Sequence, residues 1–208
     1  MRSKFVLAAL FLAAAVQGSP QTAPAGREGA SRLFVGGGVS GYDANFYGNY
    51  LMEGATIWID FYPNLGPKFL HGLGIEAEGR DICFGRPADA ALLGASNLAE
   101  QTGGGGAIYS WRHFHQFAPY AKFQWEHANI DFDFGIPNYG HDTRNLYAGG
   151  LGVDYRVSRY VWVRAGYEEQ YWQRLFQDHK VSTPTGIVLR PQGVTIGAEY
   201  NVHLRHRH

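Results

Sequence analysis

The sequence predicts an all-β fold, a closed up-and-down antiparallel β-barrel of about eight strands. First, many short segments alternate between apolar and polar residues with a period of two, which is typical of strands with two different faces. Second, the 208 residues include 28 Gly, 13 Tyr and 13 Phe but only 17% charged residues, a composition that favours strands and turns over helices. Third, long and short connections alternate along the chain, as in a meander of sequential strands.

The N-terminus has the features of a secretory signal peptide. Arg2 and Lys4 precede an apolar run from Phe5 to Val16, and small residues follow, with cleavage expected near residue 18 or 25. The run of about 12 residues is shorter than the ~20 that a membrane-spanning helix needs. We therefore expect residues 1–25 to be removed, residues 26–31 to form a linker, and the chain to be exported. A short buried or amphipathic helix is the alternative, which the lack of a polar face disfavours.

Four strands are predicted in the first half of the chain. They are residues 33–40, 55–62, 71–82 and 99–111. In the second of them, Ile57, Ile59 and Phe61 share one face. Prolines and a glycine make a short turn at 63–67, whereas a longer loop with Pro87 follows the third strand.

Four more strands are predicted in the second half. They are residues 120–126, 147–156, 161–168 and a final strand that begins near Ile187 and ends at Val202. Only residues 157–159 separate the sixth strand from the seventh, while the final strand follows a long polar loop and is expected to bend at Pro191.

Two features indicate that the apolar face points outward, into a membrane. The charged face also carries many glycines, and small residues suit the crowded interior of an eight-stranded barrel. Aromatic residues lie on the apolar face, several near strand ends, as the interfacial girdle of a membrane barrel requires. These residues are Phe61, Trp125, Tyr155, Tyr167 and Tyr200. The alternatives are a soluble lipocalin-like carrier, with the apolar face inside, and a secreted β-sandwich.

The last strand carries a pattern that resembles a known family. Thr195, Gly197, Tyr200 and Val202 resemble the C-terminal assembly signal of bacterial outer-membrane β-barrels, although that family usually ends on Phe. The whole chain is similar to the small eight-stranded barrels of the outer-membrane protein A type. The resemblance implies a bacterial outer-membrane barrel over residues 32–203, followed by a basic, histidine-rich tail, 204–208. It also implies contact with outer-membrane lipid and with the β-barrel assembly machinery, and we expect a monomer.

With the polar face inside, the barrel lumen collects charges of both signs. They are Asp60, Glu76, Glu78, Arg80, Lys122, Glu126, Asp154, Arg156, Arg164, Glu168 and Glu199. Such charges must be paired or hydrated. We expect them to plug the lumen with salt bridges. Because acids outnumber bases, the alternative is a narrow porin-like channel that favours cations.

Other chemistry is poorly supported by the sequence. A net charge of +0 gives no electrostatic reason for a nucleic-acid partner. His141-Asp142 and Asp178-His179 are expected in loops, where they could assist a hydrolase or a metal ion, but such residues are usually only solvated. Cys83 has no neighbour that would activate it. We therefore expect no enzyme, cofactor or metal, but a structural or surface-interaction role in which long loops contact any extracellular ligand.

Overall fold

The computed structural model describes residues 32–44, 51–63, 67–84, 97–112, 116–133, 141–175 and 187–202. The predicted signal peptide, linker and tail, and the Asp178-His179 pair, lie outside them. The strands are β1 (Arg32–Asp43), β2 (Leu51–Tyr62), β3 (Leu73–Phe84), β4 (Asn97–Ser110), β5 (Phe117–Asp133), β6 (His141–Arg156), β7 (Val161–Leu175), β8 (Ile187–Leu189) and β9 (Gln192–Val202), with a 3-10 helix, η1 (Lys68–Leu70), between β2 and β3. No helix in these ranges is long and apolar enough to cross a bilayer.

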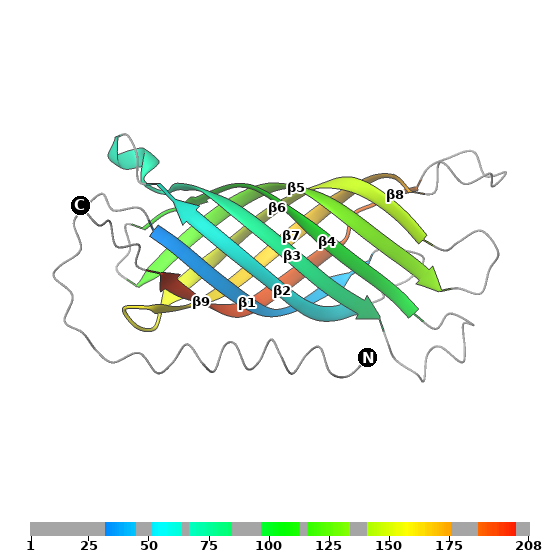
Figure 1. Cartoon of the computed structure of the whole chain (residues 1–208), viewed down its shortest axis with the longest axis horizontal. Coiled ribbons are helices and arrows are strands. Elements are labelled where there is room, and N and C mark those ends of the chain that lie inside the picture. Colours follow the sequence, from blue (N-terminus) through cyan, green and yellow to red (C-terminus); the bar gives the residue numbers. More distant parts are fainter. Residues whose placement is uncertain are drawn as a thin grey trace. The chain divides into compact units, whose positions relative to one another are not determined.

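The strands close into an antiparallel barrel (Figure 1). Each strand from β1 to β7 pairs with the next, and β9 pairs with both β7 and β1, which closes the ring. The short β8 pairs with β7, and Pro191 interrupts the chain before β9. The Pro191 carbonyl still accepts a hydrogen bond from the Gln170 backbone N–H at 2.9 Å. β8 and β9 therefore fill one position, which confirms the prediction of about eight strands with a bend at Pro191.

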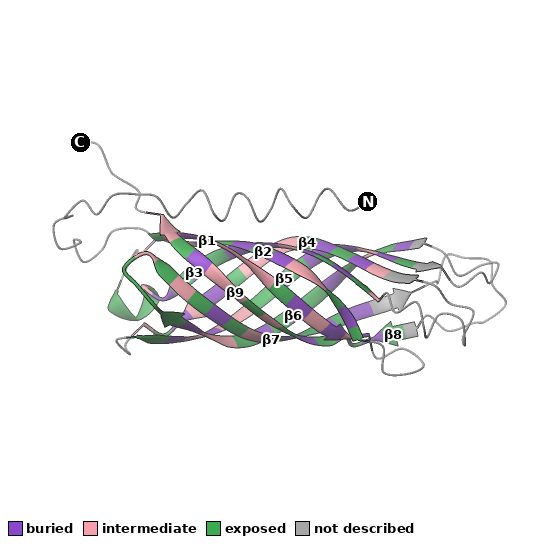
Figure 2. Ribbon diagram, turned by 90° about the horizontal axis from the view of Figure 1, so that it is seen from below, coloured by how far each residue is buried: buried purple, intermediate pink, exposed green. Residues whose placement is uncertain are grey.

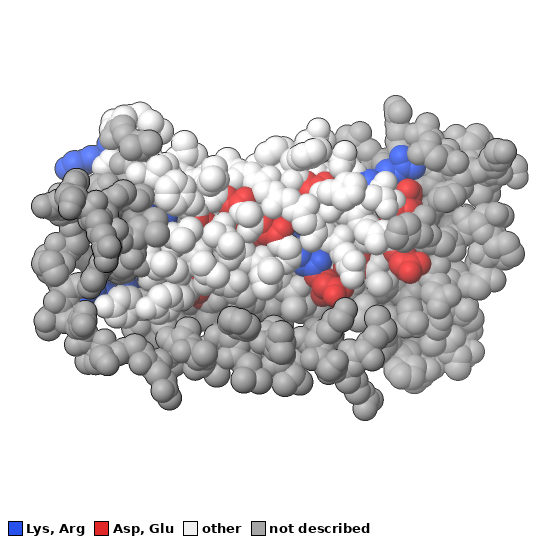
Figure 3. All heavy atoms as spheres, in the orientation of Figure 1, with Lys and Arg blue, Asp and Glu red and all other residues white. Residues whose placement is uncertain are grey.

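Over most of the barrel, apolar side chains point outward and polar ones inward. Figure 2 shows exposed and buried residues alternating along the strands. Outward-facing Val39, Ile57 and Ile75 are 70%, 66% and 63% exposed, whereas inward-facing Glu76 and Arg164 are only 2% and 3% exposed. Uncharged residues cover most of the described surface in Figure 3. The alternative of a soluble carrier with an apolar interior is therefore wrong for this part of the barrel.

We call this outward-facing apolar surface the membrane band. Its exposed members are Val35, Val39, Ile57, Ile59, Leu73, Ile75, Phe123, Trp125, Leu151, Val163, Tyr167, Val194 and Ile196. Lipid can cover such a surface without leaving a backbone group unsatisfied, because a closed barrel pairs its strands all round.

Polarity inverts at the end of the barrel where β1, β3, β5 and β7 end; we call this the loop end. The inward-facing side chains there include an apolar core, beside which Glu100, Asp142 and Gln170 are also buried. The core consists of Tyr42, Ala44, Met52, Ile82, Ala128, Ile130, Leu146, Ala148, Trp172 and Leu189. Their outward-facing neighbours are mostly polar, namely Glu53, Asp81, Gln101, His127, Asp131, Thr143, Asn145, Glu169 and Gln192. We call this region the collar. It has the polarity of a water-soluble barrel.

The collar corrects several sequence-based boundaries. The strands continue beyond the predicted ends at residues 55, 126, 147 and 168, because apolar and polar positions exchange faces there and the expected alternation stops. His141 and Asp142 therefore lie at the start of β6 rather than in a loop, and Cys83 lies in β3. At the opposite, turn end, the connection 63–72 contains η1 and is longer than 44–50, so it is not the short turn that the prolines suggested.

Candidate functional site: the charged lumen

One guanidinium gathers four carboxylates near the middle of the lumen. Arg164 on β7 donates to Asp154 through Nε at 2.8 Å and to Glu76 through Nη1 at 2.7 Å. Its Nη2 donates to Asp60 at 2.6 Å and lies 3.2 Å from a carboxylate oxygen of Glu199. These partners come from β2, β3, β6 and β9, so the Arg164 cluster connects five strands through one side chain.

A second cluster lies nearer the collar and is built on Arg80 and Lys122. Arg80 Nη2 lies 2.8 Å from Glu168 Oε1, and Lys122 Nζ lies 2.8 Å from Glu168 Oε2. Both cations also contact Glu78, and Lys122 reaches Glu76 at 3.1 Å, which joins the two clusters. This Arg80–Lys122 cluster connects β3, β5 and β7.

Two carboxylates near the second cluster have no cationic partner. Glu126 and Glu100 are 1% and 0% exposed, and neither forms an ion pair within the described part of the chain. Glu100 was not among the predicted lumen residues, because Glu100, Gln101 and Thr102 are all polar and show no alternation in sequence. Carboxylates therefore outnumber cations in the lumen even more than the sequence suggested.

Nearly all of the predicted lumen residues face the interior. Arg156 differs, because it is exposed at the turn end as the last residue of β6. Its guanidinium lies 6.0 Å from the ring of Trp162, and it forms no ion pair with a carboxylate of the described residues. An inward-facing side chain at the end of a strand reaches solvent, so Arg156 belongs to the rim and not to the charge clusters.

Apolar layers lie on both sides of the charged region. The collar core lies on the loop side, and Phe34, Tyr62, Ile108 and Tyr120 pack together with Trp162 on the turn side. We call the latter the turn-end layer. Arg112 stacks over the Tyr62 ring at 3.8 Å, and Tyr62 meets Phe34 edge-on at 6.0 Å.

The space between these layers is filled by side chains. Trp58 crosses the lumen and donates from its indole N–H to Glu199 at 3.0 Å. It fits because Gly36 and Gly197 carry no side chain where the indole lies; an added Cβ at either would clash with ring atoms. A cavity of about 10 Å³ borders Trp58, Tyr120 and Lys122, which is room for about one water molecule.

The residues of the predicted assembly signal lie on both faces of β9. The Thr195 hydroxyl faces the lumen and shares a hydrogen bond of 2.7 Å with Ser40. Tyr200 faces outward, 39% exposed, and its ring stacks on Tyr160 with centroids 5.9 Å apart. Val202 pairs with Leu33 at the seam where β1 closes the barrel.

The outward apolar band, the closed strand order and the ionic interior together define a transmembrane β-barrel. The family model described as "Outer membrane protein beta-barrel domain" matches residues 5–202. The chain therefore belongs to this family and is a protein of the bacterial outer membrane. A comparison with curated proteins finds no significant match.

Solved structures of outer-membrane proteins share the fold. Neisserial surface protein A has a TM-score of 0.57 at 14% identity, with 82% of this chain and 96% of that chain covered. OprG of Pseudomonas aeruginosa has a TM-score of 0.55 at 13% identity, covering 85% and 98%. Ail, the attachment invasion locus protein of Yersinia pestis, has a TM-score of 0.50 at 16% identity, covering 84% and 99%. At these identities the similarity concerns the fold alone.

Proposed function

We propose that this protein is a closed, non-conducting barrel of the outer membrane that acts as a structural or surface-interaction component. The observation that carries the proposal is the Arg164 cluster, in which one guanidinium binds carboxylates from Asp60, Glu76, Asp154 and Glu199 across the lumen. A solute that passes through the barrel would have to break these contacts, and each one lost would leave a buried charge without its partner.

The two apolar layers support the same conclusion. The collar core and the turn-end layer place buried side chains such as Trp172 and Tyr62, each 0% exposed, above and below the charged region. Hydrated ions do not cross packed apolar side chains without a local opening. The barrel thus has three successive obstacles along its axis.

With the lumen closed, the surface offered to partners is the loop end. The loops that join the collar strands would carry any contact with an extracellular ligand, and the predicted assembly signal in β9 would be recognised by the assembly machinery. Replacing one loop by a short Gly-Ser linker should change surface binding while leaving the barrel folded. The proposal includes no catalytic step. We therefore expect no hydrolytic activity in the wild-type protein or in the His141→Ala and His179→Ala variants.

A narrow cation channel is the second candidate, favoured by the excess of lumen carboxylates. Single-channel recording in a planar bilayer separates the two, with an open porin in the same membrane as the positive control. The closed barrel predicts no steady conductance from heat-modifiable, folded protein. Steady unitary steps that become smaller in Glu76→Gln would contradict it and would make the charged lumen a conducting path.

A further inference from the structure

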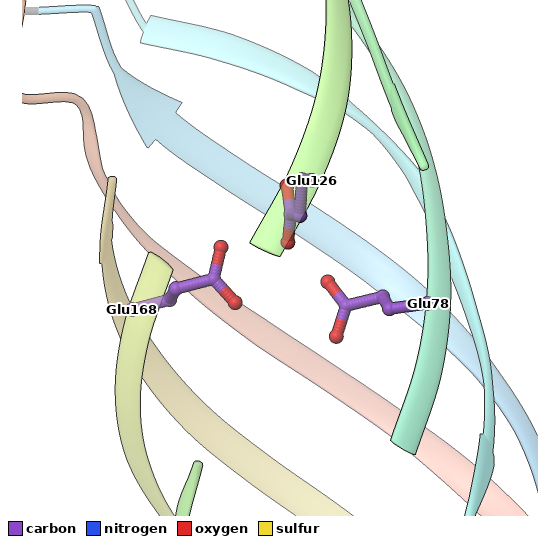
Figure 4. Close-up of side chains that lie close together, drawn as sticks. All are labelled: Glu78, Glu126 and Glu168. Carbon is purple, nitrogen blue, oxygen red and sulfur yellow. The ribbon is translucent and has the colours of Figure 1, made fainter. Parts of the chain in front are cut away.

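Three glutamates from different strands converge in the lumen next to the collar. Figure 4 shows the carboxylates of Glu78, Glu126 and Glu168 pointing toward one another from β3, β5 and β7. One oxygen of each lies within 4.8 Å of an oxygen of the other two. Their exposed fractions are 9%, 1% and 3%, so water does not screen their mutual repulsion. We call them the three-glutamate cluster.

Glu126 shows that the cluster lacks a positive charge. Its carboxylate points into the cluster, yet neither oxygen has a hydrogen-bond partner among the described residues. A buried ionised carboxylate without a partner is costly, because its lost hydration is not replaced. Glu126 therefore needs a cation or a proton.

Arg80 and Lys122 do not meet this need. Both contact Glu78 and Glu168, and neither forms an ion pair with Glu126 in the described part of the chain. Two side-chain cations thus face three carboxylates, and Glu100 adds a further buried acid nearby. A carboxylate offers about four lone-pair sites. Glu78 and Glu168 can therefore keep their basic partners and still serve as ligands.

We propose that Glu78, Glu126 and Glu168 bind a divalent cation of about the size of calcium. Hard divalent cations prefer carboxylate oxygens, and calcium takes them at about 2.3–2.6 Å, so two ligand oxygens can lie up to about 5 Å apart. One oxygen of each glutamate lies within 4.8 Å of the others, which satisfies that limit for any pair, and a small inward movement of the side chains would bring all three to one ion. Magnesium, at about 2.0–2.1 Å, would need the oxygens within roughly 4.2 Å of one another, and it also demands near-ideal octahedral geometry.

The cation would act as a link between strands. Its ligands lie on β3, β5 and β7, no two of which are neighbours in the barrel. Bound calcium would hold these strands together across the lumen, beneath the collar core, and would stabilise the folded barrel by its binding free energy. The site does not depend on whether the lumen conducts, since a buried structural ion and a closed or an open path are separate properties.

Metal content and thermal stability test the site directly. The full chain is refolded into zwitterionic detergent without lipopolysaccharide, which itself binds calcium, and is stripped with EDTA. After refolding in calcium and gel filtration, elemental analysis should find about one calcium per chain and the melting temperature should rise. Magnesium at equal concentration should bind at least about tenfold more weakly. Protein that retains no calcium and shows no calcium-dependent melting shift would overturn the proposal.

A matched pair of variants separates a ligand effect from a general charge effect. Glu126→Gln removes one ligand, whereas Glu100→Gln removes an equally buried acid outside the cluster. We expect Glu126→Gln to weaken calcium binding by about tenfold or more, and Glu100→Gln to retain the wild-type affinity. Equal losses in both variants would overturn the site. If Glu126→Gln does not show the heat-dependent mobility of a folded barrel, Glu126→Asp supplies the same comparison with the charge kept and the ligand withdrawn.

Discussion

The membrane band and the collar are parts of the same strands with opposite polarity. In β3, outward-facing Ile75 is 63% exposed and inward-facing Glu76 is buried, whereas further along the strand outward-facing Asp81 is exposed and inward-facing Ile82 is buried. Backbone pairing is continuous through both parts. The strands of a barrel wall therefore do not themselves determine which face is apolar. The surrounding medium determines which face is apolar, because lipid surrounds the band and water surrounds the collar.

The two interiors are stabilised in different ways. The band encloses ion pairs, whose contribution depends on every partner being present, while the collar encloses apolar side chains, whose contribution grows with buried area.

The largest effect is expected from Arg164→Leu. It removes the cation from four carboxylates, and breaking a buried pair typically costs about 3–5 kcal/mol, so we expect a barrel that folds poorly or not at all. Arg156→Leu is the matched control at the exposed rim and should change stability by about 0.5 kcal/mol or less. Urea unfolding in lipid vesicles, followed by gel mobility with and without heating, gives both values. Equal stability of the two variants would show that the cluster does not hold the barrel together.

An effect of similar size is expected in the collar core. Trp172→Ala leaves a cavity where a fully buried indole packed, at a cost of about 3–5 kcal/mol. Trp125→Ala in the membrane band, where the indole is 55% exposed, should cost less than half as much because lipid fills the space. Unfolding in the same vesicles compares the two. A larger loss for Trp125→Ala would mean that the collar has no well-packed core.

The outward faces should differ in their tolerance of charge. Ile75→Lys places an ammonium in the membrane band and should cost about 2–4 kcal/mol. Asp81→Lys on the same strand lies in the collar, where water solvates it, and should change stability by about 0.5 kcal/mol or less. The yield of folded, vesicle-inserted protein and its urea midpoint are the measurements. A loss of stability for Asp81→Lys as large as for Ile75→Lys would mean that the membrane band extends over the collar.

Labelling of Cys83 should leave the stability of the barrel unchanged and should report which end of the barrel faces the outside of the cell. The thiol is exposed on β3 in the collar. If the loop end faces the outside of the cell, a membrane-impermeant maleimide should label Cys83 in intact cells. Ser158→Cys in a Cys83→Ser background places the only thiol at the turn end, and it should react only after the cells are broken. Labelling of the turn-end thiol alone in intact cells would reverse the orientation.

The sequence was sufficient for the barrel and for the charged interior, but not for the collar. Alternation predicted inward-facing Glu76 and outward-facing Ile75 because the phase is constant through the band. In the collar, Ile82 and Trp172 point inward. A rule that places polar residues on the inside therefore ended the predicted strands too early. The period of two persists in the collar, but there the apolar residues point inward and the polar residues point outward.

The contacts inside the lumen could not be predicted from the sequence. Alternation placed the lumen acids and bases on one face, but which of them meet depends on the register and tilt of all the strands. Nothing local relates Arg164 to Asp60, which lies 104 residues away along the chain and 2.6 Å away in space. Glu126 likewise looks the same in sequence as its paired neighbours, and only the structure shows that neither of its carboxylate oxygens has a hydrogen-bond partner among the described residues.

The five-strand span of the Arg164 cluster also bears on how the barrel is made. The cluster draws on β2, β3, β6, β7 and β9, so no early portion of a chain emerging into the periplasm can balance its own charges. A partial sheet that lacks β7 holds the carboxylates of Asp60, Glu76 and Asp154 without Arg164, and carboxylates without a partner favour water over lipid. The ring closes only when β9 pairs with β1. Insertion and ring closure should therefore be nearly simultaneous, and a chain truncated before β9 should remain a target for periplasmic proteases instead of lodging in the bilayer as an open sheet.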